Sequence, residues 1–104
     1  MASDREYLNF ILEQLSELDG VSYRAMMGEF ILYYRGKVFG GIYDDRFLVK
    51  DLPSAAKLMP QASRELPYDK GSPMLMVDNI DDKSFLSSLV TAMYDELPEK
   101  KIKK

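Results

Sequence analysis

Two groups of aspartates are the side chains of this 104-residue sequence whose spacing is most suited to chemistry. Asp44 and Asp45 are adjacent, and Asp78, Asp81 and Asp82 lie close together further along the chain. Several carboxylate oxygens are the ligands that Mg²⁺ and Ca²⁺ need. Neither group has the loop spacing or the glycine of a calcium-binding loop, and turn formation and helix capping explain both. We therefore expect no metal site and no cofactor.

The sequence contains neither histidine nor cysteine. Nucleophile pairs of the Ser-His and Cys-His kind are therefore impossible. A general acid or base would have to be a carboxylate, a lysine or a tyrosine with a strongly shifted pKa. The sequence thus predicts a protein that is not an enzyme. A chain without cysteine also fits a reducing compartment, which favours a cytoplasmic location.

Lysines are concentrated at the end of the chain. Lys100, Lys101, Lys103 and Lys104 are all positive, whereas the whole chain has a formal net charge of −3, so the remainder is more acidic still. An acidic body repels phosphate, and we expect nucleic acid to bind weakly if at all, through these four lysines. The alternative is a solvated tail. We expect one folded domain over residues 1–98 and a disordered lysine-rich tail over 99–104.

The periodicity of apolar residues predicts two long helices. Residues 3–18 carry apolar side chains at spacings of three and four along one face, and Ser3 with Glu6 forms a capping-box pattern. Residues 82–97 show the same period, with Asp81 as the expected N-cap. No apolar run approaches the roughly 20 residues that cross a bilayer, so no contact with a membrane is expected.

Short runs rich in Tyr, Phe, Ile and Val lie between these helices, separated by turn residues. This pattern is typical of antiparallel strands joined as a meander, with turns at Arg35-Gly36-Lys37 and Asp44-Asp45-Arg46. The strands are expected at residues 22–27, 29–35, 37–43, 46–50 and 74–78, with a short helix over 54–59. The first two runs could instead form one bent strand. The predicted α+β order is helix, four strands, helix, strand, helix.

Four segments follow one another within this order: Met26-Met27-Gly28-Glu29-Phe30, Tyr34-Arg35-Gly36-Lys37-Val38-Phe39, Asp44-Asp45-Arg46-Phe47-Leu48-Val49-Lys50 and Pro67-Tyr68. In these segments the chain resembles the TfoX N-terminal domain family, named for a bacterial competence regulator also called Sxy. The resemblance covers roughly residues 5–98 and indicates a stand-alone short member that lacks the helical C-terminal domain. It implies a two-layer sandwich with the helices on one face of an antiparallel sheet, in a bacterial cytoplasmic protein linked to transcriptional regulation.

The predicted strands are apolar on both faces, although a sheet covered by helices on one side should alternate apolar and polar residues. Strict alternation places Tyr33, Phe39 and Tyr43 on the uncovered face, where an aromatic patch is typical of a protein interface. The alternative is that the tyrosine rings cover the sheet while their hydroxyls face water. Gly40-Gly41, in mid-strand, indicates either a depression that admits a ligand or a partner backbone, or else a β-bulge or tight helix packing.

These observations favour a non-catalytic protein-interaction or regulatory module. Self-association as a homodimer is the first candidate, through the face that carries Tyr33, Phe39 and Tyr43. The alternative is a nucleic-acid-associated regulator that uses the basic C-terminal tail.

Overall fold

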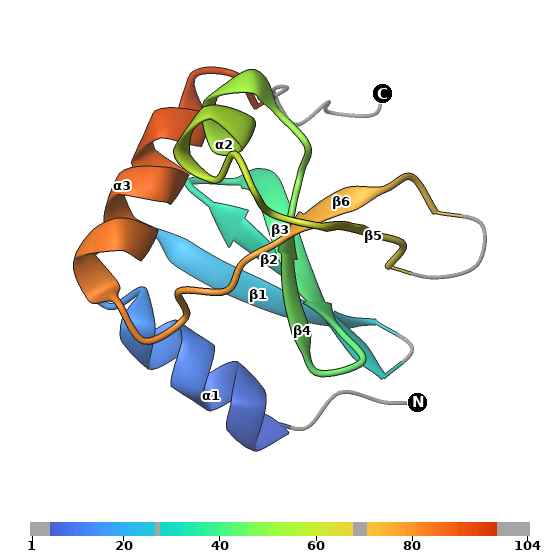
Figure 1. The fold of residues 1–104 in the computed structure, drawn as a ribbon. Helices are drawn as coiled ribbons and strands as arrows, with labels where there is room; N and C mark the ends of the chain where they lie inside the picture. Colours follow the sequence, from blue (N-terminus) through green and yellow to red (C-terminus); the bar gives the residue numbers. More distant parts are fainter. Residues whose placement is uncertain (1–4, 27, 68–70, 98–104) are drawn as a thin grey trace, which may run out of the picture.

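Three helices and six strands form the part of the chain that the computed structural model describes, which is residues 5–26, 28–67 and 71–97 (Figure 1). In chain order they are α1 (Arg5–Gln14), β1 (Val21–Met26), β2 (Glu29–Tyr34), β3 (Lys37–Tyr43), β4 (Arg46–Val49), α2 (Pro53–Leu58), β5 (Arg64–Glu65), β6 (Met74–Met76) and α3 (Lys83–Tyr94).

All six strands belong to one antiparallel sheet in the order β1-β2-β3-β4-β6-β5. The first four form a meander, and the chain then passes through α2 before it adds the last two. The three helices lie on one side of the sheet (Figure 1). The predicted α+β class and meander are confirmed. The predicted order lacked only the two-residue strand β5, and β1 and β2 are two separate strands.

Two tight turns set the register of the central hairpins. Arg35 and Gly36 have positive φ angles of 53° and 84°, and Asp44 and Asp45 have 56° and 58°. Two consecutive positive φ angles define the two-residue turn whose twist matches that of the flanking strands. The turns pair Tyr34 with Lys37 and Tyr43 with Arg46. Asp44 and Asp45 therefore serve as turn residues, as the sequence indicated.

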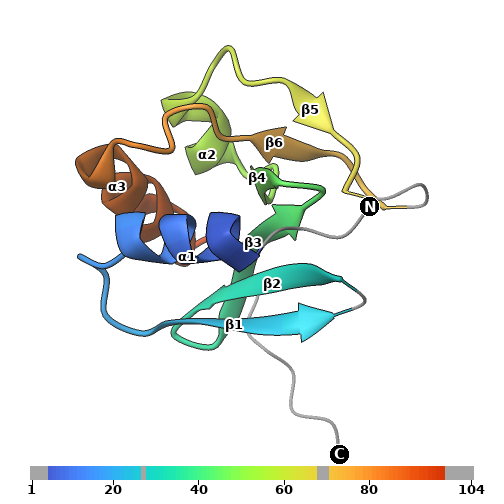
Figure 2. The same cartoon turned by 90° about the horizontal axis from the view of Figure 1, so that it is seen from below.

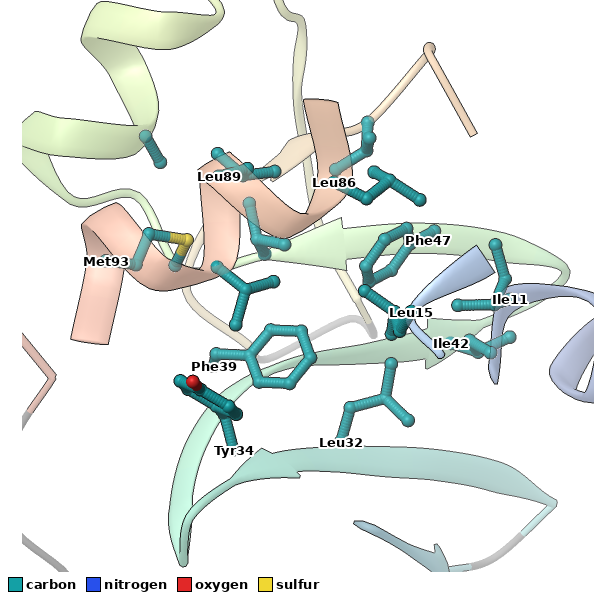
Figure 3. Packing of buried hydrophobic residues seen from close by; sticks show 14 of the residues in the cluster. Ile11, Leu15, Leu32, Tyr34, Phe39, Ile42, Phe47, Leu86, Leu89 and Met93 are labelled. Carbon is teal, nitrogen blue, oxygen red and sulfur yellow. The ribbon is translucent and has the colours of Figure 1, made fainter. Parts of the chain in front are cut away.

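The main core lies between the sheet and the helices, and all three helices contribute to it. Figure 3 shows side chains of α3 and α1 meeting those of β2, β3 and β4. The largest fully buried side chains of the main core are Phe39, Phe47, Leu8, Ile11, Leu15, Leu32, Ile42, Leu75, Leu86, Leu89 and Met93. A carboxylate also links α2 to the residues that follow α3, because Glu96 Oε1 accepts hydrogen bonds from the backbone N and the Oγ of Ser54, at 3.0 and 2.9 Å.

A β-bulge in β3 changes which side chains face the core. The register of β2 against β3 shifts between Leu32 and Tyr33: Leu32 pairs with Gly40 and Tyr33 pairs with Val38, so Phe39 is the extra residue. A one-residue insertion reverses the alternation of the strand beyond it. Phe39 therefore points into the core and is fully buried, between β3 and α3 (Figure 3). Its predicted position on the uncovered face was wrong.

The long helices begin and end at different residues from those predicted. The N-cap of α3 is Asp82, whose Oδ1 accepts a 3.0 Å hydrogen bond from the backbone N of Phe85. The predicted N-cap, Asp81, was therefore wrong by one residue. After Gln14 the chain tightens, since the backbone N of Ser16 bonds to the oxygen of Glu13, three residues earlier. The capping box expected at Ser3 lies outside the described residues.

Candidate interaction surface

The face of the sheet turned away from the helices is called here the outer face. Directly opposed residues of antiparallel strands point to the same face, so the register assigns its members. Its apolar and aromatic members are Met26 of β1, Ile31 and Tyr33 of β2, Val38, Gly41 and Tyr43 of β3, Leu48 of β4, and Met74 and Met76 of β6. Its polar and charged members are Ser22 and Arg24 of β1, Glu29 of β2, Arg46 of β4 and Glu65 of β5. All six strands thus contribute to the outer face, and its apolar centre lies on β2, β3, β4 and β6.

An apolar row crosses the outer face at right angles to the strands. Ile31 is paired with Gly41, Gly41 with Leu48, and Leu48 with Met76. Leu48 is completely buried, yet it faces away from the main core. The sheet therefore has a second, smaller apolar cluster, in which Ile31 and Met76 are only half-buried.

The two glycines of β3 allow a close approach of backbones around the bulge. A Cβ on Gly40 would collide with the backbone oxygen of Leu48 and lie 2.9 Å from Cα of Val49. A Cβ on Gly41 would lie 2.6 Å from the backbone oxygen of Phe30. Real Cβ atoms do not approach backbone this closely, so both positions need glycine. Of the two interpretations of Gly40-Gly41, the structure supports the bulge.

A depression of about 430 Å³ borders the outer face beside β6. Val38 and Tyr43 line it from β3, Met74 lines it from β6, and Pro67 and Pro73 line it from outside the strands. Pro67 is buried although it lies outside any strand. The apolar area of the outer face therefore continues beyond the strands onto Pro67 and Pro73.

Arg46 joins β5 and the residue after it to the end of β3. Its Nη1 lies 3.4 Å from Oε1 of Glu65, its Nη2 donates a 3.0 Å hydrogen bond to the backbone oxygen of Leu66, and its Nε donates to that of Tyr43 at 3.1 Å. One guanidinium thus ties the β3–β4 turn to β5. Its five donors in a fixed fork suit several partners at once.

A second ion pair fixes β5 from the other side. Nε of Arg64 lies 2.6 Å from Oδ2 of Asp51, and this hydrogen bond with the carboxylate raises the pKa of Arg64 above its ordinary value. The pair is exposed to solvent, so its contribution to stability is small. Arg64 is paired with the core residue Leu75 and so belongs to the helix side, whereas Arg46 and Glu65 form a charged border at one end of the outer face.

Tyr7 of α1 carries a perturbed pKa on the helix side of the sheet. Partial burial raises the pKa of its hydroxyl, a hydrogen bond with the backbone of Phe47 acts against this rise, and the negative charge of Asp45 adds to it. The hydroxyl lies on the side opposite to the outer face and marks the contact of α1 with β4.

The structure brings together two of the three predicted interface residues. Tyr33 and Tyr43 lie half-buried on the outer face, whereas Phe39 belongs to the main core. Val38 also lies on the outer face, although strict alternation in the sequence placed it on the covered face. The signal for the error was the Gly40-Gly41 pair, which marks the bulge. Lys100, Lys101, Lys103 and Lys104 lie outside the described residues, as does the boundary at residue 98.

In the described ranges, no three Asp or Glu side chains are close enough together to hold a metal ion. None of the helices in this part of the chain is long and apolar enough to span a bilayer. Comparisons with protein-family models, with curated proteins and with solved structures give no significant match to this chain.

Proposed function

We propose that this chain is a non-catalytic protein-binding module whose outer face contacts a partner protein. The observation that carries the proposal is the group of half-buried apolar side chains Ile31, Val38 and Met76 on the side that no described helix covers. Most water-facing sheet surfaces in such folds are polar. An apolar patch of this kind on a folded domain is a common mark of a binding surface.

The side chains of the outer face are suited to contact. Tyrosine and methionine are enriched in protein interfaces, and the outer face has Tyr33, Tyr43, Met74 and Met76. The charged border around Arg46 supplies a polar rim. An enzymatic alternative would lack imidazole and thiol, since the sequence contains neither histidine nor cysteine.

The resemblance to the TfoX N-terminal domain family extends the proposal to a regulatory role in the bacterial cytoplasm. It rests on the four quoted segments and on the order of the elements. Two of these segments include the turns at Arg35-Gly36 and at Asp44-Asp45, which determine the register of the sheet. On this view the outer face receives a protein that acts in transcriptional regulation.

Affinity capture from source cells with matched variants tests the proposal. Replacing Tyr33 and Val38 together with serine removes apolar area from the outer face. Phe10→Ser is the control, because it also removes an aromatic ring that solvent reaches, but from α1 on the other side of the sheet. The native chain and the control should retain the same partner, and the double variant should lose it. Equal retention by all three folded proteins would contradict the proposal.

The four terminal lysines provide a second candidate function, binding to nucleic acid. Four phosphate contacts would make binding steeply dependent on salt. Deletion of residues 99–104 should then abolish binding to duplex DNA at physiological salt. DNA binding that survives the deletion would exclude the tail as its source.

A further inference from the structure

The two border strands of the sheet differ in how well they are protected. Figure 2 shows β1 at one border and β5 at the other. β5 has only two residues, and both form ion pairs, Arg64 with Asp51 and Glu65 with Arg46. β1 has six residues, of which five are exposed, and it contains no proline, lysine or bulge. Border strands are usually protected by proline, lysine or a bulge, because an unprotected border strand can pair with a strand of another chain.

The hydrogen bonds at the start of β1 show which of its backbone groups point outward. The backbone N of Arg35 donates to the oxygen of Gly20 at 2.9 Å, so Gly20 is directed toward β2. In an antiparallel pair this direction alternates from residue to residue. The N–H and C=O groups of Val21, Tyr23 and Ala25 therefore point away from β2. Within the described residues, β2 is the one strand paired with β1.

We propose that β1 pairs antiparallel with β1 of a second copy of this chain, with Tyr23 opposite its own counterpart on a two-fold axis. Strand addition at an open border is a common mode of recognition, and identical chains most often form two-fold dimers. The pairing uses the border of the sheet and not the outer face. It therefore stands or falls independently of the proposed protein-binding function.

Backbone geometry selects this register. With Tyr23 on the axis, Val21 meets Ala25 of the second copy and all three outward residues lie in hydrogen-bonded pairs, about six hydrogen bonds in all. Moving the axis to Ser22 or Arg24 leaves only two such pairs, or about four hydrogen bonds. An axis between two residues would oppose side chains of different faces, which a regular antiparallel pair does not allow.

Side-chain charge selects the same register. An axis at Arg24 would place the two arginines directly opposite each other, and like charges in that position are destabilising. With the axis at Tyr23, each Arg24 instead faces Ser22 of the other copy, and the two tyrosine rings form a cross-strand aromatic pair. Tyr23 is already oriented, since Arg5 Nη1 donates a 3.1 Å hydrogen bond to its hydroxyl.

The dimer would be a continuous sheet in which the two outer faces lie on the same side. Since two six-residue strands bury little surface, we expect a weak dimer that forms at micromolar or higher concentration. Dimerisation would then double the number of outer faces available to one partner assembly, and so raise its apparent affinity.

Analytical ultracentrifugation over a range of concentrations tests the pairing. The mass of the native chain should rise from 12.0 kDa toward twice that value. Ala25→Pro removes an outward N–H without breaking the ladder with β2, so it should remain monomeric, whereas Ala25→Val should still dimerise. A native chain that stays monomeric at every concentration would overturn the proposal.

A charge exchange at Ser22 tests the register without relying on proline. Ser22→Glu places a carboxylate opposite Arg24 of the other copy and should lower the dimer dissociation constant about threefold to tenfold, while Ser22→Lys should raise it. Ser88→Glu, exposed on α3, controls for the added negative charge. Tighter dimerisation only in Ser22→Glu supports the Tyr23-centred register. Weaker dimerisation, or no difference from the control, contradicts it.

Discussion

The ring of Tyr43 lies over Gly41 on the outer face, so closely that a Cβ added to Gly41 would be 2.7 Å from Cε2 of the tyrosine. The tyrosine ring therefore occupies the space that a side chain at position 41 of the same strand would need. The glycine pair therefore has two roles. It permits the bulge, and it leaves room for the ring of Tyr43 against the sheet.

Alanine at these glycines should destabilise the fold. Gly40→Ala would press a methyl group against the backbone of Leu48, which cannot move without breaking the β3–β4 ladder, so we expect a loss of about 2 kcal/mol or more in the free energy of unfolding. Gly36→Ala is the comparison, because its Cβ meets no atom within 4 Å and the cost of about 1 kcal/mol comes from the positive φ alone. Urea denaturation measures both. Equal losses would argue against the close approach.

Phe39 should behave as a core residue. Phe39→Ala removes a fully buried ring that packs edge-to-face on Phe47, with ring centroids 6.4 Å apart, and should cost about 4 kcal/mol. Tyr33→Ala, on the outer face, should cost about 1 kcal/mol. The free energies of unfolding, measured under the same conditions, give the comparison. If Phe39→Ala were the milder change, the bulge would be misplaced.

The start of α3 depends on one carboxylate. Asp82→Ala removes the acceptor for the backbone N of Phe85 and should lower stability by about 1 kcal/mol. Asp81→Ala makes the same chemical change one residue earlier and should have little effect. Thermal melts of the two variants distinguish these positions, and a larger loss in Asp81→Ala would reverse the assignment of the cap.

Stability should fall at alkaline pH because of Tyr7. Burial raises the pKa of its hydroxyl in the folded chain above 10.0, its ordinary value, so the folded state holds this proton more tightly than the unfolded state does. The resulting stabilisation is complete below the ordinary pKa and is lost as pH rises through the higher folded value. Tyr7→Phe should therefore lose less stability than the native chain over that interval. Urea denaturation on both sides of the interval measures this difference, and parallel losses would contradict it.

Local chemistry made most of the fold predictable from the sequence. Arg35-Gly36 and Asp44-Asp45 form turns because of their own residue types, and they determine where β2, β3 and β4 begin and end to within about one residue. β5 escaped prediction because two residues show no period; it exists through pairing with β6 and through the ion pairs of Arg64 and Glu65.

The candidate surface was predicted only in part, because a bulge is a property of two strands and not of one. Tyr33 and Tyr43 were placed on the correct face, but the inserted residue sent Phe39 inward and brought Val38 outward. Leu48 lies in an apolar run buried on both faces, and such a run gives no periodicity from which to tell one side from the other.

Methyl NMR of the chain bound to its captured partner tests the central claim most directly, because the two faces carry different methyl groups. Partner contact at the outer face should shift the resonances of Ile31, Val38 and Met76 and leave those of Leu86 and Leu89, in the core beneath α3, unchanged. Shifts confined to exposed residues on the helix side of the molecule, such as Leu58, would contradict the account.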